Sequence, residues 1–117
     1  DQVLSKYIPE HTNLDLPKFF FAYWVTITND SEITVKITER HWEITDALGQ
    51  TEIIDGEGVV GKQPTLKPGD SFSYNSFCPL KTEFGMMKGY YEVEREDGHF
   101  MKIIIPDFQL ISPFAIN

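Results

Sequence analysis

Apolar and polar residues alternate with a period of two along most of this chain, and that period is typical of β-strands with one buried face. In residues 24–29, Val25 and Ile27 alternate with more polar neighbours. Similar strand-like runs recur over residues 33–38, 41–46, 51–54, 71–78, 89–96 and 99–106. No segment keeps helical spacing for three turns without an interrupting glycine, proline or β-branched run. The pattern therefore predicts an all-β fold.

Turn signals separate these runs and indicate how the strands connect. Gly49 lies in a tight turn, Pro68 and Gly69 form a second turn, and Asp97-Gly98 is a strong hairpin signal. A strand recurs roughly every dozen residues, which is the spacing of an antiparallel β-sandwich. We therefore expect two packed sheets with about seven to eight antiparallel strands in total. The candidate core residues are Val25, Ile27, Trp42, Ile44, Phe72, Tyr74 and Ile104.

The length and the charge of the chain limit what it can do. Its 117 residues match one domain, so we expect residues 1–117 to form a single unit. Eighteen acidic residues against ten Lys and Arg give a net charge of −8, which argues against a nucleic acid or an anionic membrane surface as the partner. The apolar runs are shorter than the ~20 residues that span a bilayer, and we expect no secretion leader.

The single cysteine favours a cytoplasmic protein, and the absence of catalytic motifs favours one without enzymatic activity. Cys78 is the single cysteine, so we expect no internal disulfide and no zinc ribbon, and a reducing cytoplasm is the predicted location. Cys78 precedes Pro79 at the end of an apolar strand, where a thiol usually behaves as a small buried hydrophobe. The sequence contains no G-x-S-x-G signature and no other assembled catalytic set. We therefore expect no catalysis and no cofactor.

A long central block, residues 40–74, reads RHWEITDALGQTEIIDGEGVVGKQPTLKPGDSFSY. YIPE precedes it at residues 7–10, and CPL at 78–80 and IPDFQL at 105–110 follow it. In these motifs and in their order the chain resembles the ApaG (DUF525) family over essentially its whole length. The resemblance implies a fibronectin type III-like or immunoglobulin-like β-sandwich, in agreement with the alternation. Residues 75–77 depart from the small Ser-Gly pair that the family often has before the cysteine.

The resemblance implies little that is specific about function. The family is associated with cobalt resistance and magnesium efflux, and it brings no established enzymatic activity. The same domain occurs fused to F-box segments, where a role in binding other proteins is expected.

A glycine-rich segment, residues 56–61, spells the G-x-G-x-x-G pattern. In dinucleotide-binding folds this loop ends a strand and opens a helix whose N-terminus holds a pyrophosphate. Two prolines within the next eight residues forbid that helix, so we reject the dinucleotide-binding interpretation. A structural loop, which we favour, and an anion or nucleotide site remain as alternatives, although Asp55 and Glu57 would repel a phosphate. The residues of the anion-site alternative are Gly56, Gly58, Gly61 and Lys62.

His41 lies between Glu39 and Glu43 on one strand, so the three side chains are expected on one face. A histidine flanked by two carboxylates is a candidate ligand set for a borderline divalent cation such as Co²⁺. The alternative is an ordinary solvated strand face with Trp42 in the core. We favour that alternative, because charged alternation is typical of exposed strands. The other histidines, His11 and His99, lie at no metal-ligand spacing.

The chain has more aromatic residues than one core face can hold. Residues 19–24 place rings on both sides of one strand, and Tyr90 and Tyr91 repeat the pattern. The outward rings are covered either by the C-terminal tail around Phe114 or by a partner. We predict an interaction surface that includes Phe20, Tyr23 and Tyr90, because aromatic residues are enriched at interface cores.

The sequence thus favours a non-catalytic β-sandwich module that binds another protein of unknown identity, or a second copy of itself as a homodimer. The alternative function is a small-ligand sensor. That sensor would bind a nucleotide polyphosphate, a pyrophosphate or a divalent cation near residues 56–61.

Overall fold

The fold consists of strands and turns, as the alternation predicts. A computed structural model describes residues 2–8 and 19–112 of the chain. Its eight strands are β1 (Gln2–Tyr7), β2 (Phe19–Thr28), β3 (Val35–Asp46), β4 (Thr51–Glu57), β5 (Thr65–Leu66), β6 (Ser71–Leu80), β7 (Phe84–Arg95) and β8 (Phe100–Ile111). In these residues, no helix is long and apolar enough to cross a membrane.

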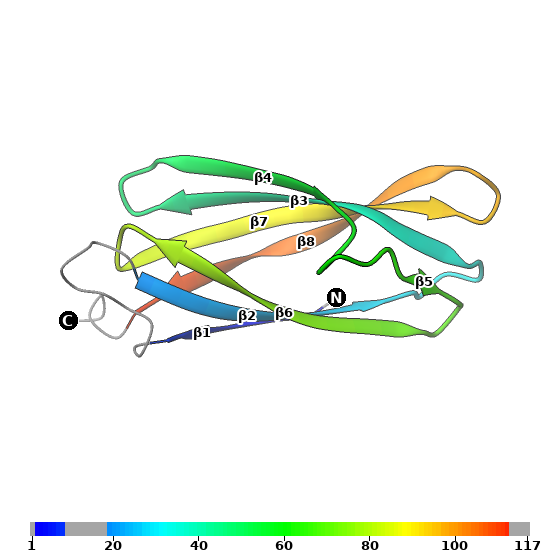
Figure 1. The fold of residues 1–117 in the computed structure, drawn as a ribbon, viewed down its shortest axis with the longest axis horizontal. Coiled ribbons are helices and arrows are strands. Elements are labelled where there is room, and N and C mark those ends of the chain that lie inside the picture. The colour runs from blue at the N-terminus through cyan, green and yellow to red at the C-terminus, as the bar shows by residue number, and fades with distance from the viewer. Residues whose placement is uncertain (1, 9–18, 113–117) are drawn as a thin grey trace.

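The strands build two antiparallel sheets that pack face to face as an elongated sandwich (Figure 1). The three-stranded sheet has the order β1-β2-β6, and the five-stranded sheet has the order β4-β3-β7-β8, with β5 pairing to the start of β3. On one side of the sandwich, Ser5 Oγ donates a hydrogen bond to the Gln109 carbonyl and links β1 to β8. On the opposite side, β4 and β6 are the sheet edges. The expected all-β sandwich is confirmed.

A cluster of aromatic side chains fills the space between the sheets. The Trp42 ring packs edge-to-face against Tyr23 at 5.6 Å, Phe108 at 5.8 Å and Tyr91 at 6.2 Å between ring centroids. The hydroxyl groups of Tyr74 and Tyr91 form a buried hydrogen bond with each other. Burial raises the pKa of Tyr74 to about 12 and that of Tyr91 further, so both phenols stay neutral.

Most of the predicted core residues lie inside the sandwich. Val25, Ile27, Trp42, Ile44 and Tyr74 are buried, and Phe72 is half-buried against the same cluster. The prediction for Ile104 is wrong, since its side chain is 67% exposed on the outer face. Ile105 is buried instead, and Ile103 is half-buried. Residues 103–105 are all isoleucine, so the sequence contains no alternation from which to read the inward face.

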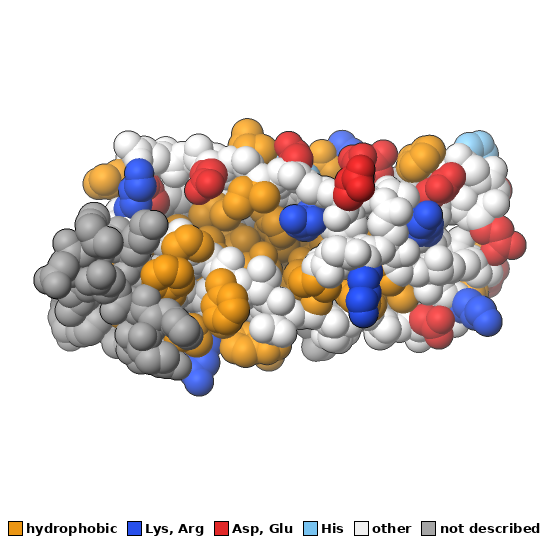
Figure 2. All heavy atoms as spheres, viewed as in Figure 1, with side chains coloured by type: hydrophobic (Ala, Val, Ile, Leu, Met, Phe, Trp, Pro, Cys, Tyr) orange, Lys and Arg blue, Asp and Glu red, His pale blue; other side chains and the backbone are white. Residues whose placement is uncertain are grey.

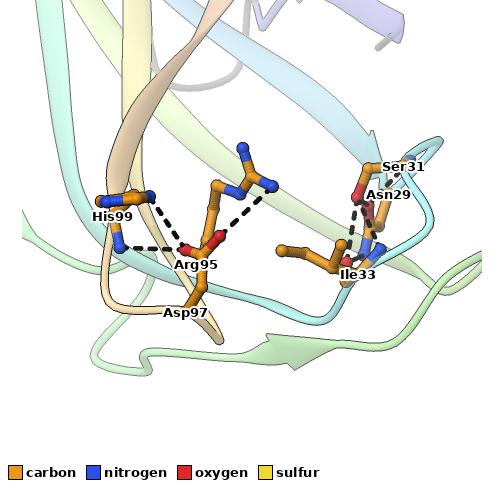
Figure 3. Close-up of polar contacts among 6 residues, drawn as sticks. All are labelled: Asn29, Ser31, Ile33, Arg95, Asp97 and His99. Atoms are coloured by element: carbon orange, nitrogen blue, oxygen red, sulfur yellow. Dashed lines mark hydrogen bonds and ion pairs between the residues drawn. The ribbon is translucent and has the colours of Figure 1, made fainter.

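The turns at one end of the sandwich are held by short polar contacts (Figure 3). Asn29 is buried, and its Nδ2 donates to the carbonyls of Ile33 and Leu66, both at 2.9 Å. Its Oδ1 accepts from the backbone and hydroxyl of Ser31. Asn29 therefore fixes the β2–β3 connection and joins it to β5. In the β7–β8 hairpin, Asp97 contacts Arg95 and His99, and Gly98 takes the positive φ that the turn requires.

Replacing Tyr91 by phenylalanine tests the buried hydroxyl pair. The change leaves the Tyr74 hydroxyl in the core without this partner, so we expect a loss of about 1–2 kcal/mol in the free energy of unfolding by urea titration. Tyr90→Phe is the matched control, because it removes the same atom from a half-buried ring on the outer face. It should cost less than about 0.5 kcal/mol. Equal effects of the two changes would contradict the prediction.

Candidate functional site

A row of side chains crosses four strands on the outer face of the five-stranded sheet. Asp55 of β4, His41 of β3, Tyr90 of β7 and Ile104 of β8 are successive cross-strand partners. The rings of His41 and Tyr90 stack with their centroids 4.7 Å apart. Lys102 Nζ lies 4.4 Å from the centroid of the Tyr90 ring. The register of the sheet thus gathers an imidazole, an ammonium group, a phenol ring and a carboxylate at one place.

Two carboxylates hold the ring nitrogens of His41. Nδ1 lies 2.5 Å from Asp55 Oδ1, and Nε2 lies 3.2 Å from Glu43 Oε2. The hydrogen bond to Asp55 is the main reason that the pKa of His41 is raised above its ordinary 6.5, against a smaller opposing effect of burial, and Glu43 adds to the increase. The two carboxylates therefore stabilise the imidazolium form, which donates from both nitrogens, relative to the neutral ring.

The structure changes the predicted grouping of Glu39, His41 and Glu43. Glu43 contacts His41, but the second carboxylate at the imidazole is Asp55 and not Glu39. Asp55 lies fourteen positions further along the chain, on a neighbouring strand, so spacing along β3 does not reveal it. Within residues 2–8 and 19–112, no three His, Cys, Asp or Glu side chains are placed to hold a metal ion.

A hollow of about 560 Å³, here called the outer hollow, borders this row on the same face. Phe84, Met86 and Ile111 contribute large apolar side chains that are 39–49% exposed. Glu43 belongs both to the outer hollow and to the His41 row. The full lining consists of Glu43, Thr45, Asp46, Phe84, Gly85, Met86, Lys88, Asp107, Gln109 and Ile111.

The glycine-rich loop after β4 closes into a tight turn. The Val59 N–H donates to the Lys62 carbonyl at 2.8 Å, and the Lys62 N–H donates back at 3.0 Å. Val60 and Gly61, between them, have φ angles of 44° and 77°, the positive pair of a type I′ turn. The Gly58 N–H donates to the Thr38 carbonyl at 2.7 Å. Three N–H groups that an anion site would need are therefore bonded to carbonyls.

The Arg40 side chain lies over Gly56, the first glycine of this segment. Its Nη1 donates to the carbonyls of Glu57 and Gly58, both at 3.1 Å. A Cβ atom on Gly56 would lie 2.6 Å from the guanidinium carbon of Arg40, so a larger residue at this position would displace the flexible end of the Arg40 side chain. The geometry supports the structural interpretation of Gly56, Gly58 and Gly61. Lys62 takes part through its backbone, and Arg40 is the contact that the sequence pattern does not reveal.

The aromatic residues predicted as an interaction surface lie in three different places. Tyr23 is 6% exposed and packs in the core against Trp42 and Phe108, so its prediction as a surface residue is wrong. Because strand residues alternate, the adjacent Trp24 is the ring that faces outward. Phe20 and Tyr90 are half-buried on the outer faces of different sheets. His11 and the tail around Phe114 lie outside the described residues.

Cys78 is a buried thiol, as its position before Pro79 predicts. Burial raises the pKa of Cys78 to about 12, and the nearby charge of Glu52 adds to the increase. The thiol is therefore protonated at neutral pH and is a weak nucleophile.

Comparison with known proteins agrees with this architecture. The family model of the ApaG domain matches residues 9–95. Protein ApaG of Beijerinckia indica is 49% identical, over 97% of this chain and 87% of its own length. Protein ApaG of Bdellovibrio bacteriovorus is 44% identical, over 99% of this chain and 93% of its own. A crystal structure from Bordetella pertussis, whose protein is described as ApaA, has a TM-score of 0.91 at 39% identity and covers 96% of this chain and 91% of that chain.

The fold thus defines a small two-sheet β-sandwich, the architecture that fibronectin type III domains share. Sequence and structure together identify the family within that class. The chain belongs to the ApaG family.

Substituting the loop glycines one at a time tests the structural role of the loop. A Cβ atom on Gly58 would lie 2.0 Å from the Lys62 carbonyl oxygen, whereas one on Gly61 would meet open space, and both residues have positive φ. We expect Gly61→Ala to cost about 1 kcal/mol for its φ angle alone, and Gly58→Ala to cost at least about 1 kcal/mol more. Urea unfolding measures both. Equal costs would show that the close approach is relieved without strain.

The stability of the fold should depend on pH through His41. Because the folded-state pKa is raised, protonated His41 stabilises the fold fully below its ordinary pKa of about 6.5, and this contribution is lost as the pH rises through the raised value. Between about pH 6.5 and about pH 9, the urea midpoint of the parent should fall more than that of His41→Gln. His99→Gln, a change in the exposed β7–β8 turn, should behave like the parent. Parallel curves for the parent and His41→Gln would refute this.

Proposed function

We propose that this chain is a non-catalytic module that binds another protein, and that the outer hollow is its binding surface. The observation that carries the proposal is the apolar floor of that hollow on a sheet face. Phe84, Met86 and Ile111 come from two adjacent strands and expose large side chains within one concavity. A fully buried side chain of this kind contributes about 1.5–3 kcal/mol, so covering this floor is a substantial source of affinity.

The charges around the outer hollow describe the kind of partner it fits. Glu43, Asp46 and Asp107 contribute carboxylates to the lining, against the ammonium group of Lys88. The chain as a whole carries a net charge of −8. Opposite charges speed association and exclude wrong partners. The complementary partner therefore presents an apolar side chain next to Lys or Arg residues.

The ionisable groups described above support binding more than catalysis. The Cys78 thiol is buried and protonated, and both ring nitrogens of His41 are engaged by carboxylates. A general base needs a nitrogen or oxygen available to the reacting group. We place the protein in the cytoplasm, because its single thiol is compatible with a reducing compartment.

The small-ligand alternative stays a prediction from the glycine-rich segment, and the association with cobalt and magnesium stays a prediction of the resemblance. Calorimetric titration of the whole chain with Co²⁺, Mg²⁺ and diadenosine tetraphosphate tests them directly. The contacts of Gly58 and Arg40 lead us to expect no saturable heat at the glycine-rich loop. A complex of micromolar affinity that Gly58→Ala abolishes, while the melting temperature stays unchanged, would establish the alternative.

Removing the apolar floor tests the proposed function. We expect the double change Phe84→Ser and Met86→Ser to keep the far-UV circular dichroism spectrum and to reduce partner capture from a cytoplasmic extract about tenfold or more. Phe100→Ser is the matched control, because Phe100 is also exposed and pairs with Glu94 at the other end of the same two strands. The proposal fails if the double variant retains every protein that the parent and the control retain.

A further inference from the structure

The edge strands of the two sheets differ in how they are protected from added strands. β4 carries Glu52, Asp55 and Glu57, β8 carries Lys102, Pro106 and Asp107, and β1 carries Lys6. Charged residues and prolines of this kind are the usual means by which proteins block pairing at a sheet edge. β1 is also linked to β8 by the hydrogen bond of Ser5.

β6 lacks this protection. Its sequence, SFSYNSFCPL, contains no charged residue in ten, and its one proline, Pro79, is next to the end. It pairs with β2 over ten consecutive positions without a register shift. In the part of the chain that the structure describes, β2 is its only partner strand. β6 is therefore a long, regular and uncharged edge that presents a row of backbone groups to one side.

A second concavity, here called the edge hollow, lies beside the last part of β6. Its volume is about 470 Å³, and it lies between the two sheets, where β4 and β6 face each other. Figure 2 shows this side of the molecule, with hydrophobic side chains visible in the hollowed region. Ile44 and Leu80 provide apolar surface in it, Glu52 and Asp46 provide carboxylates, and Lys81 provides a cation.

We propose that β6 accepts an extended segment of a partner protein as an added strand, with alternate side chains of that segment entering the edge hollow. In strand addition, main-chain hydrogen bonds give affinity, and pockets for every second side chain give specificity. β6 supplies the first requirement and the edge hollow supplies the second. Of the lining residues, this surface shares Asp46 with the outer hollow. The residues changed to test the two proposals differ, so each proposal can fail without the other.

The lining of the edge hollow indicates the chemistry of the added segment. An inward side chain that meets Ile44 and Leu80 has to be apolar. The next inward side chain, two residues along, reaches the region of Glu52 on the exposed strand β4. Asp46 Oδ1 already accepts from the N–H groups of Leu48 and Gln50, so Glu52 is the better placed carboxylate for a new ion pair. The inward positions of the segment, which are every second residue, therefore carry an apolar residue and then Lys or Arg.

The net charge favours such a segment over a second copy of this chain. Pairing β6 with its counterpart in a second copy would bring two β4 strands, each with Glu52, Asp55 and Glu57, toward the same side. Like charges that approach in this way oppose association. A basic segment would meet the same carboxylates with attraction.

The probe is a peptide of about nine residues, since that length matches most of β6. Its inward positions, every second residue, carry valine and lysine in turn, with threonine at the positions between them. We expect it to bind the full chain and to slow amide hydrogen exchange in β6, but not in β7 or β8. A peptide of the same length with glutamate in place of lysine should bind at least about fivefold more weakly. A lysine peptide with N-methyl groups on alternate residues of its pairing edge should not bind, because it lacks the main-chain donors.

Glu52→Lys tests the proposed ion pair between the edge hollow and the lysine of the added segment. Glu96→Lys, at the far β7–β8 turn, is the matched control. We expect Glu52→Lys to weaken the lysine peptide about fivefold and to strengthen the glutamate peptide, while Glu96→Lys changes both less than about twofold. The proposal is overturned if the lysine peptide does not bind at about millimolar concentration, if N-methylation is tolerated, or if protection appears outside β6. It is also overturned if β6 becomes protected by self-association alone, since the occupant is then a second copy.

Discussion

The packing of Trp42 between the sheets is the contact on which the rest of the structure depends. Its ring meets aromatic side chains from β2, β7 and β8 in edge-to-face geometry. Each such pair contributes about 0.5–1.5 kcal/mol beyond the burial of its area. Gly89 lies opposite Trp42 in the five-stranded sheet, and a Cβ there would come within 3.0 Å of the indole and 2.0 Å of the His41 carbonyl. The close approach of the β3 backbone at His41 therefore requires a glycine on β7, and the indole leaves little room beside it.

This inner packing also determines the outer surface, because neighbouring residues on a strand face opposite sides. With Trp42 in the core, His41 and Glu43 face outward, and with Tyr91 in the core, Tyr90 faces outward. The register between β3 and β7 then places His41 against Tyr90, and the register between β3 and β4 places Asp55 against His41. The His41 row is thus a consequence of the aromatic core. The proposed binding surface next to it depends on the same registers.

Much of the fold could be predicted from local signals, and each failure has a physical cause. Alternation and turn residues were sufficient for the β-sandwich and for the turns at Gly49, Gly69 and Gly98, all of which have positive φ. The prediction of core residues fails for Ile104, because three consecutive isoleucines give no alternation that would show which of them face inward. It also ends the last strand at Pro106, whereas β8 continues to Ile111. Proline is tolerated there because β8 is an edge strand and its pairing with β7 is irregular between Met87 and Gly89.

By itself the sequence determined the class of fold, the positions of the turns and the family, because these depend on the order and spacing of nearby residues. It also showed that Glu39, His41 and Glu43 alternate along one strand. Only the tertiary structure decided that Asp55 replaces Glu39 at His41, that Tyr23 is buried while Trp24 is exposed, and that Arg40 packs over Gly56. These outcomes depend on which strands pair and in which register. Register is set by the packing of the whole core, so no local pattern contains it.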